Sequence, residues 1–294
     1  MNAPSITAAP ATRLADLLPG FVTATMFATS NVLSKIVLIS GADVLTLSFF
    51  RGAVGIVLLA AWFGLGTRPK PHTPRARWIS IGLGVIFAGV VFGLFAAFAR
   101  VAVPIGILSY FIYPLMTGLL GILFGLERIS WRGALAALVA FAGLTLMIRA
   151  NPHDIAWAGV AFAFGSAMCR TAILLITRAT LQDSDPQTTT WYTIVASTAV
   201  LGLAALVTWN WQGPQTAAGW AAMMVVSVGT TVGIMCMFIS VKRIGPFRTA
   251  LVMFLEPLFT TILSAPVLGE VITPMQALGG AVMLAALVSF QLRR

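Results

Sequence analysis

The sequence predicts an all-α integral membrane protein with ten transmembrane helices, arranged as two inverted five-helix repeats. Three observations carry this prediction: the composition, ten apolar runs, and a repeat that contains an odd number of spans. The 294 residues are 59% hydrophobic and 9% charged, with a mean hydropathy of +0.97, whereas soluble domains carry about 25% charged residues. So few charged side chains cannot cover a soluble fold of this size. The composition therefore excludes a soluble enzyme, a disordered protein and a disulfide scaffold.

Ten apolar runs, bounded by charged residues, glycine or proline, predict the spans. A helix needs about 20 apolar residues to cross the hydrocarbon core, and the runs do not alternate as the strands of a barrel would. These runs divide the chain into a cytoplasmic N-terminal tail over 1–16, a first repeat over 17–149 and a second repeat over 155–292. The expected spans are 17–39, 43–65, 78–99, 103–124, 131–149, 155–178, 188–209, 218–240, 246–268 and 274–292.

The distribution of basic residues predicts the orientation. With the N-terminus inside, thirteen Lys and Arg residues fall on the inner side, and two, Arg100 and Arg149, fall on the outer side. Lys35, Arg51 and Arg170 lie within spans. This positive-inside bias places both termini in the cytoplasm, which we expect to be that of a bacterial cell with the protein in its inner membrane. The net charge of +10 thus reports topology, and no nucleic-acid partner is expected.

An internal repeat links the two halves. Each copy contains a basic residue, a proline that opens a helix, a second proline within the span and a glutamate just past its end. Because the repeat is five spans long, the second copy must cross the membrane in the opposite direction, as in carriers that rock around a midplane site. The matching positions are Pro104 with Pro246, Pro114 with Pro257, and Glu127 with Glu270.

Several short motifs follow one another in a characteristic order. They are Ser30-Asn31, Arg51, the Pro104 to Pro114 unit, Leu255-Glu256-Pro257 and Leu268-Gly269-Glu270. With these motifs the chain resembles the EamA-type ten-helix branch of the drug/metabolite transporter superfamily, over about residues 17–292. Within that branch it looks most like the exporters of aromatic and other neutral amino acids. The resemblance implies a central cavity walled chiefly by spans 1, 3, 4, 6, 8 and 9, with spans 5 and 10 peripheral.

Polar side chains in the middle of spans are the candidate substrate-binding residues, because polar groups at mid-bilayer are costly. Glu256 is the only acidic residue at the centre of a span. It is a candidate proton-coupling group or counter-ion for a substrate ammonium, or alternatively a partner for backbone groups freed by Pro257. Tyr110 and Tyr113 are expected to line the cavity or to bond between helices. The predicted substrate-binding set is Ser30, Asn31, Tyr110, Tyr113, Arg170, Ser227, Thr230, Met253 and Glu256.

Four prolines are the predicted hinges of alternating access: Pro104, Pro114, Pro246 and Pro257. The remaining basic groups within the spans have simpler interpretations. Arg51 is expected to pair with carbonyls or another buried polar group, and Lys35 to reach the outer interface. Arg170 either attracts a substrate carboxylate or extends toward the inner side.

These features predict a secondary transporter that exports amino acids, aromatic and other neutral ones, or similar small metabolites. The alternatives are a multidrug or other metabolite carrier of the same fold, and an intramembrane lipid-modifying enzyme. The sequence has no phosphate-binding motif for ATP hydrolysis and no catalytic motif, so we expect no enzyme activity and no ATPase partner. We also expect no cofactor and no metal site. The expected partners are the substrate and membrane lipid.

Overall fold

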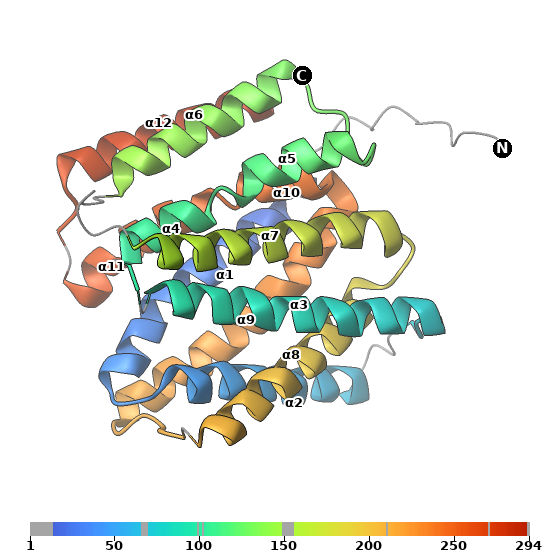
Figure 1. The fold of residues 1–294 in the computed structure, drawn as a ribbon, viewed down its shortest axis with the longest axis vertical. Coiled ribbons are helices and arrows are strands. Elements are labelled where there is room, and N and C mark those ends of the chain that lie inside the picture. The colour runs from blue at the N-terminus through green and yellow to red at the C-terminus, as the bar shows by residue number, and fades with distance from the viewer. Residues whose placement is uncertain are drawn as a thin grey trace.

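The computed structural model describes residues 14–65, 70–98, 100–101, 103–148, 156–209, 211–269 and 271–292. Most of the N-terminal tail, Arg149 and Glu270 lie outside these residues. The described helices are α1 (Leu14–Ile39), α2 (Val44–Leu65), α3 (Pro74–Phe98), α4 (Val103–Tyr110), α5 (Tyr113–Leu123), α6 (Trp131–Met147), α7 (Trp157–Thr180), α8 (Pro186–Thr208), α9 (Ala217–Ile244), α10 (Pro246–Val252), α11 (Leu255–Leu268) and α12 (Pro274–Leu292) (Figure 1).

The helices make ten crossings, as the sequence predicts. Eight candidate spans are long and apolar enough to cross a membrane, and two of these, Ile105–Leu123 and Pro246–Leu268, each contain a pair of shorter helices. Two shorter apolar helices, Trp131–Met147 and Pro274–Phe290, complete the set among the described residues. We call the side on which α1 begins the N-terminal face and the other side the opposite face.

Two of the expected spans are interrupted near their centres. The fourth span breaks at Phe111–Ile112, between α4 and α5, and the ninth breaks at Met253–Phe254, between α10 and α11. In both cases the new helix carries a proline in its first turn, Pro114 or Pro257. Proline fits the first turn because no backbone donor is needed there, and inside a continuous span it could not donate to the carbonyl four residues earlier. The repeat thus appears as two equivalent breaks.

The packing of the helices follows the inverted repeat. Helix α1 packs along α9 and against α11, while the equivalent helix α7 packs along α3 and against α4 and α5. Helices α6 and α12 lie side by side at one edge of the molecule (Figure 1). A Cβ atom on Gly143 would lie 2.7 Å from the carbonyl oxygen of Gly279. The glycines therefore allow the two main chains to touch.

On each face, one acidic side chain of the first half binds backbone of the second half. On the opposite face, Asp43 accepts a 2.7 Å hydrogen bond from the Gln212 N–H. On the N-terminal face, Glu127 accepts a 2.9 Å hydrogen bond from the Phe247 N–H, at the start of α10. We call these contacts the Asp43 clasp and the Glu127 clasp. They connect the halves at the two ends of the bundle.

Candidate functional site

The predicted site residues meet where the broken helices approach α1 and α7. On α1, the Asn31 side-chain amide donates a 2.9 Å hydrogen bond to Oε1 of Glu256, in the first turn of α11. Asn31 is exposed and Glu256 is partly buried. The pair therefore joins α1 to α11 through a carboxylate and an amide.

Arg170 of α7 lies on the other side of this region and is only 2% exposed. Its guanidinium lies over two aromatic rings, 5.3 Å from the centroid of Phe27 and 5.9 Å from that of Tyr113. Its Nη2 atom contacts Sδ of Met253 at 3.4 Å, and its Nε has no hydrogen-bond partner among the described residues. Aromatic faces attract a cation but accept few hydrogen bonds. The guanidinium is therefore held by aromatic faces and a thioether, and its Nε–H donor is unpaired in the described part of the chain.

Arg170 and Glu256 carry opposite charges within one electrostatic environment. Each acts on the other through space, yet the described part of the structure contains no direct ion pair between them. Helix α7 carries the cation and α11 the anion, so the two charges come from different packed elements. This arrangement provides separate attachment points for a solute with both an anionic and a cationic group.

An aromatic cluster closes the site around the two helix breaks. Tyr110 and Tyr113 have ring centroids 5.3 Å apart, and Phe111 lies 5.7 Å from Tyr113 and 6.2 Å from Phe254. Tyr113 is 0% exposed, and its hydroxyl has no hydrogen-bond partner among the described residues. The two tyrosines therefore sit within an apolar wall in this conformation, and only their neighbourhood to Arg170 gives them a polar contact.

The hydroxyl groups of Ser30, Ser227 and Thr230 make contacts of another kind. Ser30 donates to the Val226 carbonyl at 3.5 Å, and Thr230 donates to Ser30 at 3.5 Å, so both connect α1 with α9. Ser227 donates to a carbonyl one turn earlier in its own helix. In this conformation Ser30 and Thr230 join two helices and Ser227 bonds within its own helix, and a binding role for the three hydroxyls stays a prediction.

Three phenylalanines belong to the site although the sequence did not indicate them: Phe27, Phe111 and Phe254. Phe27 precedes Asn31 by one helical turn, so both project from the same face of α1. Phe111 and Phe254 occupy the two helix breaks. The sequence did contain a signal for Phe111 and Phe254, because they stand at matching points of the repeat, a few residues before Pro114 and Pro257.

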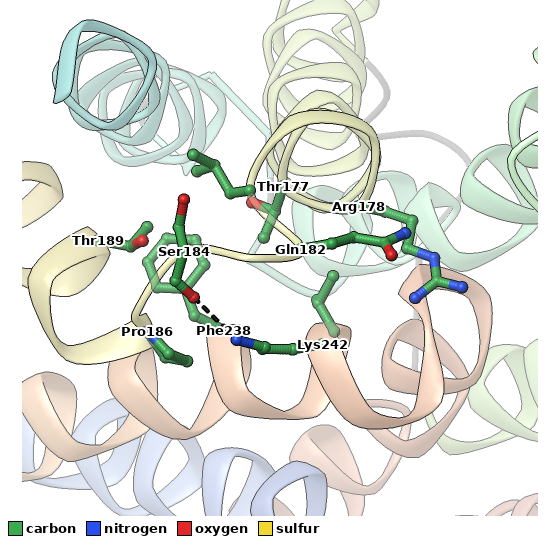
Figure 2. A pocket seen from close by; sticks show the side chains of 10 residues that line it. Thr177, Arg178, Gln182, Ser184, Pro186, Thr189, Phe238 and Lys242 are labelled. Atoms are coloured by element: carbon green, nitrogen blue, oxygen red, sulfur yellow. Dashed lines mark hydrogen bonds between the residues drawn. The ribbon is translucent and has the colours of Figure 1, made fainter. Parts of the chain in front are cut away.

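A separate pocket lies on the N-terminal face, between the α7–α8 connection and α9. Figure 2 shows Lys242 reaching across it to donate a 3.0 Å hydrogen bond to the Ser184 carbonyl. The cavity, about 10 Å³, has room for about one water molecule. None of the predicted substrate-binding residues lines it. Among the described residues, no group of three or more His, Cys, Asp or Glu side chains could hold a metal ion.

Comparisons with known proteins agree with this architecture. A solved crystal structure shares 19% of its sequence with this chain and superposes with a TM-score of 0.77, over 96% of this chain and 100% of the other. At that identity the likeness shows the fold alone. A search of curated proteins found no match. The model of the EamA-like transporter family matches twice, over residues 15–149 and 157–290. The chain therefore belongs to the EamA-like transporter family, whose members are non-enzymatic carriers of metabolites.

Proposed function

We propose that this transporter exports amino acids, aromatic and other neutral ones, by alternating access. An amino acid carries a carboxylate and an ammonium group on one carbon atom. The opposite charges of Arg170 and Glu256 support this substrate class, because they can hold those two groups without first neutralising each other. The observation that carries the proposal is that Arg170 and Glu256, both described by the structure, act on each other through space without a direct ion pair between them.

The aromatic wall supports the preference for aromatic substrates. Tyr113, Phe27 and Phe111 present ring surfaces beside Arg170. A stacked or edge-on aromatic pair contributes about 0.5–1.5 kcal/mol beyond the burial of its surface. A substrate ring that displaced part of this wall would gain such contacts, whereas a small aliphatic side chain would not.

The helix breaks supply the conformational part of the proposal. Pro104 and Pro246 open the first segments of the two broken spans, and Pro114 and Pro257 open the second segments. Bending at these points would move α5 and α11 relative to α7 and α1. Glu256 lies directly beside the second break, so its protonation state or its substrate contact could bias that motion. We therefore retain Glu256 as the candidate coupling group.

Substrate flux into and out of proteoliposomes tests the proposal. Vesicles loaded with unlabelled phenylalanine should accumulate labelled phenylalanine by exchange, and Arg170→Gln should reduce this exchange at least tenfold. The matched control is Arg132→Gln, at the exposed start of α6. If no amino acid moves down its gradient or with a pH gradient, the proposed substrate class is wrong. Movement of a lipophilic cation instead would favour the multidrug alternative.

Glu256→Gln separates coupling from binding. If Glu256 carries protons, the variant should lose dependence on a pH gradient while substrate exchange continues. If Glu256 only braces α11, the variant should lower thermal stability and leave the pH dependence of transport unchanged. The glutamine side-chain oxygen can still accept the Asn31 hydrogen bond, but more weakly than the carboxylate does, so any loss of stability should be small.

A further inference from the structure

A second cavity, between α2, α3, α8 and α9, contains a positive charge that the described residues around it do not neutralise. Arg51 lines this cavity together with Ser48, Thr198 and Thr231. The space is about 10 Å³, enough for about one water molecule. Of the predicted substrate-binding residues, Thr230 alone lines this cavity. It is therefore separate from the region around Arg170 and Glu256.

Arg51 lacks the partner that the sequence led us to expect. In the described part of the structure no hydrogen bond or ion pair involves its guanidinium. The carboxylate of Asp43, one of the few acids in the first half, is occupied by the Leu45, Thr46 and Gln212 donors. A charge within the membrane-spanning region is strongly destabilising unless it is compensated. Arg51 is partly buried, so a negative group beside its guanidinium would stabilise it, and the described side chains provide none.

Thr198 adds a second unmatched donor at the same place. The side chain is 5% exposed, and its hydroxyl has no hydrogen-bond partner among the described residues. Gly52 brings α2 so close that a Cβ atom there would collide with this hydroxyl. A Cβ on Gly55 would lie 2.5 Å from the Thr231 hydroxyl. The two glycines therefore hold α2 against α8 and α9, and they place the Arg51 and Thr198 donors around one small space.

We propose that this cavity binds a monovalent halide ion, chloride under physiological conditions. The guanidinium neutralises the charge of the ion, and the Thr198 hydroxyl turns its proton toward it. Both groups then act as donors to one acceptor, which satisfies the two unpaired groups together. Among the abundant physiological anions, a monatomic halide such as chloride needs the least room beyond the single water that the space admits. A carboxylate or phosphate would need more room.

Thermal unfolding of the purified full chain in detergent tests this assignment. The temperature midpoint is measured in sodium chloride, sodium bromide and sodium gluconate at constant ionic strength and pH. Chloride and bromide should raise the midpoint with saturation, as ligands of the folded state do, and gluconate should not. Equal midpoints in all three salts would overturn the proposal. Stabilisation by acetate without stabilisation by halides would also overturn it, and would assign the cavity to a carboxylate.

Two variants localise the effect. Arg51→Gln should abolish the difference between chloride and gluconate. Thr198→Val has nearly the same shape, and it should weaken the apparent chloride affinity about tenfold. If the cavity is empty, removal of an unpartnered hydroxyl should leave the protein equally or more stable in every salt, with the chloride effect unchanged. That result would contradict the proposal even if Arg51→Gln fails to fold.

The controls match each variant. Thr208→Val removes a hydroxyl from the same helix, where it bonds to the Ala204 carbonyl in an exposed position, and it should leave the halide effect intact. Arg132→Gln removes an exposed arginine elsewhere. Crystals grown in bromide give the direct observation. An anomalous peak between Arg51 and Thr198 is expected, and bromide peaks only at the protein surface would overturn the assignment.

Discussion

The Asp43 clasp and the Glu127 clasp perform the same connection on opposite faces, but their carboxylates experience different surroundings. Asp43 accepts hydrogen bonds from Gln212, Leu45 and Thr46. Burial alone would raise the pKa of Asp43, but these hydrogen bonds outweigh it and lower the pKa below its usual value of 3.8. The Asp43 clasp is therefore ionised throughout the neutral range.

Glu127 has fewer donors and is more enclosed. Burial raises the pKa of Glu127 to about 7, although the Phe247 N–H, Arg178 and Arg248 act in the opposite direction. The comparison shows that an acidic contact between the halves has no fixed pH dependence. The number of backbone donors and the access of water determine whether it is permanent or titrates near neutrality. Only the N-terminal face is held by a contact of the second kind.

The largest expected effect is the difference in cysteine labelling between the two faces, which tests on which side of the membrane each clasp lies. In a chain whose native cysteines are replaced, Arg75→Cys should react with an impermeant thiol reagent only from the cytoplasm. Gln215→Cys should react only from outside. The positive-inside distribution of Lys and Arg is the physical reason. The reverse labelling pattern would place the Glu127 clasp outside and would contradict the proposed orientation.

Gly245→Ala should break the Glu127 clasp. Gly245 has a φ of +84°, and an added Cβ would collide with the Glu127 carboxylate. We expect a loss of about 2–5 kcal/mol in unfolding free energy, because the Gly245 backbone (φ +84°, ψ 167°) lies in a region essentially restricted to glycine and because the Glu127 carboxylate is displaced. Chemical or thermal unfolding in detergent measures it.

Gly269→Ala is the matched control for that variant. Gly269 also has a positive φ, +69°, but nothing lies within 4 Å of an added Cβ. Its backbone is αL (φ +69°, ψ 20°), which a side chain tolerates better than the Gly245 conformation, so it should lose only about 1–2 kcal/mol. Equal losses in the two variants would mean that contact with Glu127 contributes nothing.

Glu127→Gln should remove a pH dependence of stability. Because the folded pKa of about 7 exceeds the ordinary value of 4.5, the folded state holds the proton more tightly than the unfolded state. The stability that protonated Glu127 contributes is fully present below about pH 4.5 and is lost as the pH rises through about 7. The parent protein should lose roughly 2–3 kcal/mol between pH 5 and pH 8 through this group, and the variant should not. The midpoint of thermal unfolding across that range measures the difference.

Asp43→Ala gives the smallest expected effect, and one that is constant between pH 5 and pH 8. Asp43 caps the start of α2 by accepting from the Leu45 and Thr46 N–H groups, and the loss of such a cap costs about 0.5–2 kcal/mol. The stability contributed by ionised Asp43 is present above about pH 3.8 and is lost only as the pH falls through its lower folded pKa. A pH-dependent loss between 5 and 8 would show that the two clasps do not differ as described.

The sequence predicts the helices well because membrane crossing constrains length and composition. The expected span 43–65 corresponds to α2, Val44–Leu65, and the expected span 274–292 corresponds to α12. The breaks before Pro114 and Pro257 also have a sequence cause, the backbone N–H donor that proline lacks. What the sequence could not provide is the rotation of each helix about its axis.

That rotation decides which side chains meet. Helices that are apolar on all sides carry little directional information. For this reason Phe27 and Met253 were not recognised as the neighbours of Arg170. The same limit applies to Arg51. Its span position predicts that it needs a counterpart, but the convergence with Thr198 depends on the close approach at Gly52.

The glycine contact between α6 and α12 has a consequence for the order of biosynthesis. Gly143 and Gly279 stand far apart in the sequence, and α12 leaves the ribosome long after α6. Until α12 is inserted, the glycine-bearing side of α6 has no main-chain partner at this position and faces lipid or another part of the nascent protein. The edge formed by α6 and α12 therefore closes late, and a ribosome that stalls before residue 274 would leave α6 inserted but unpaired along this face.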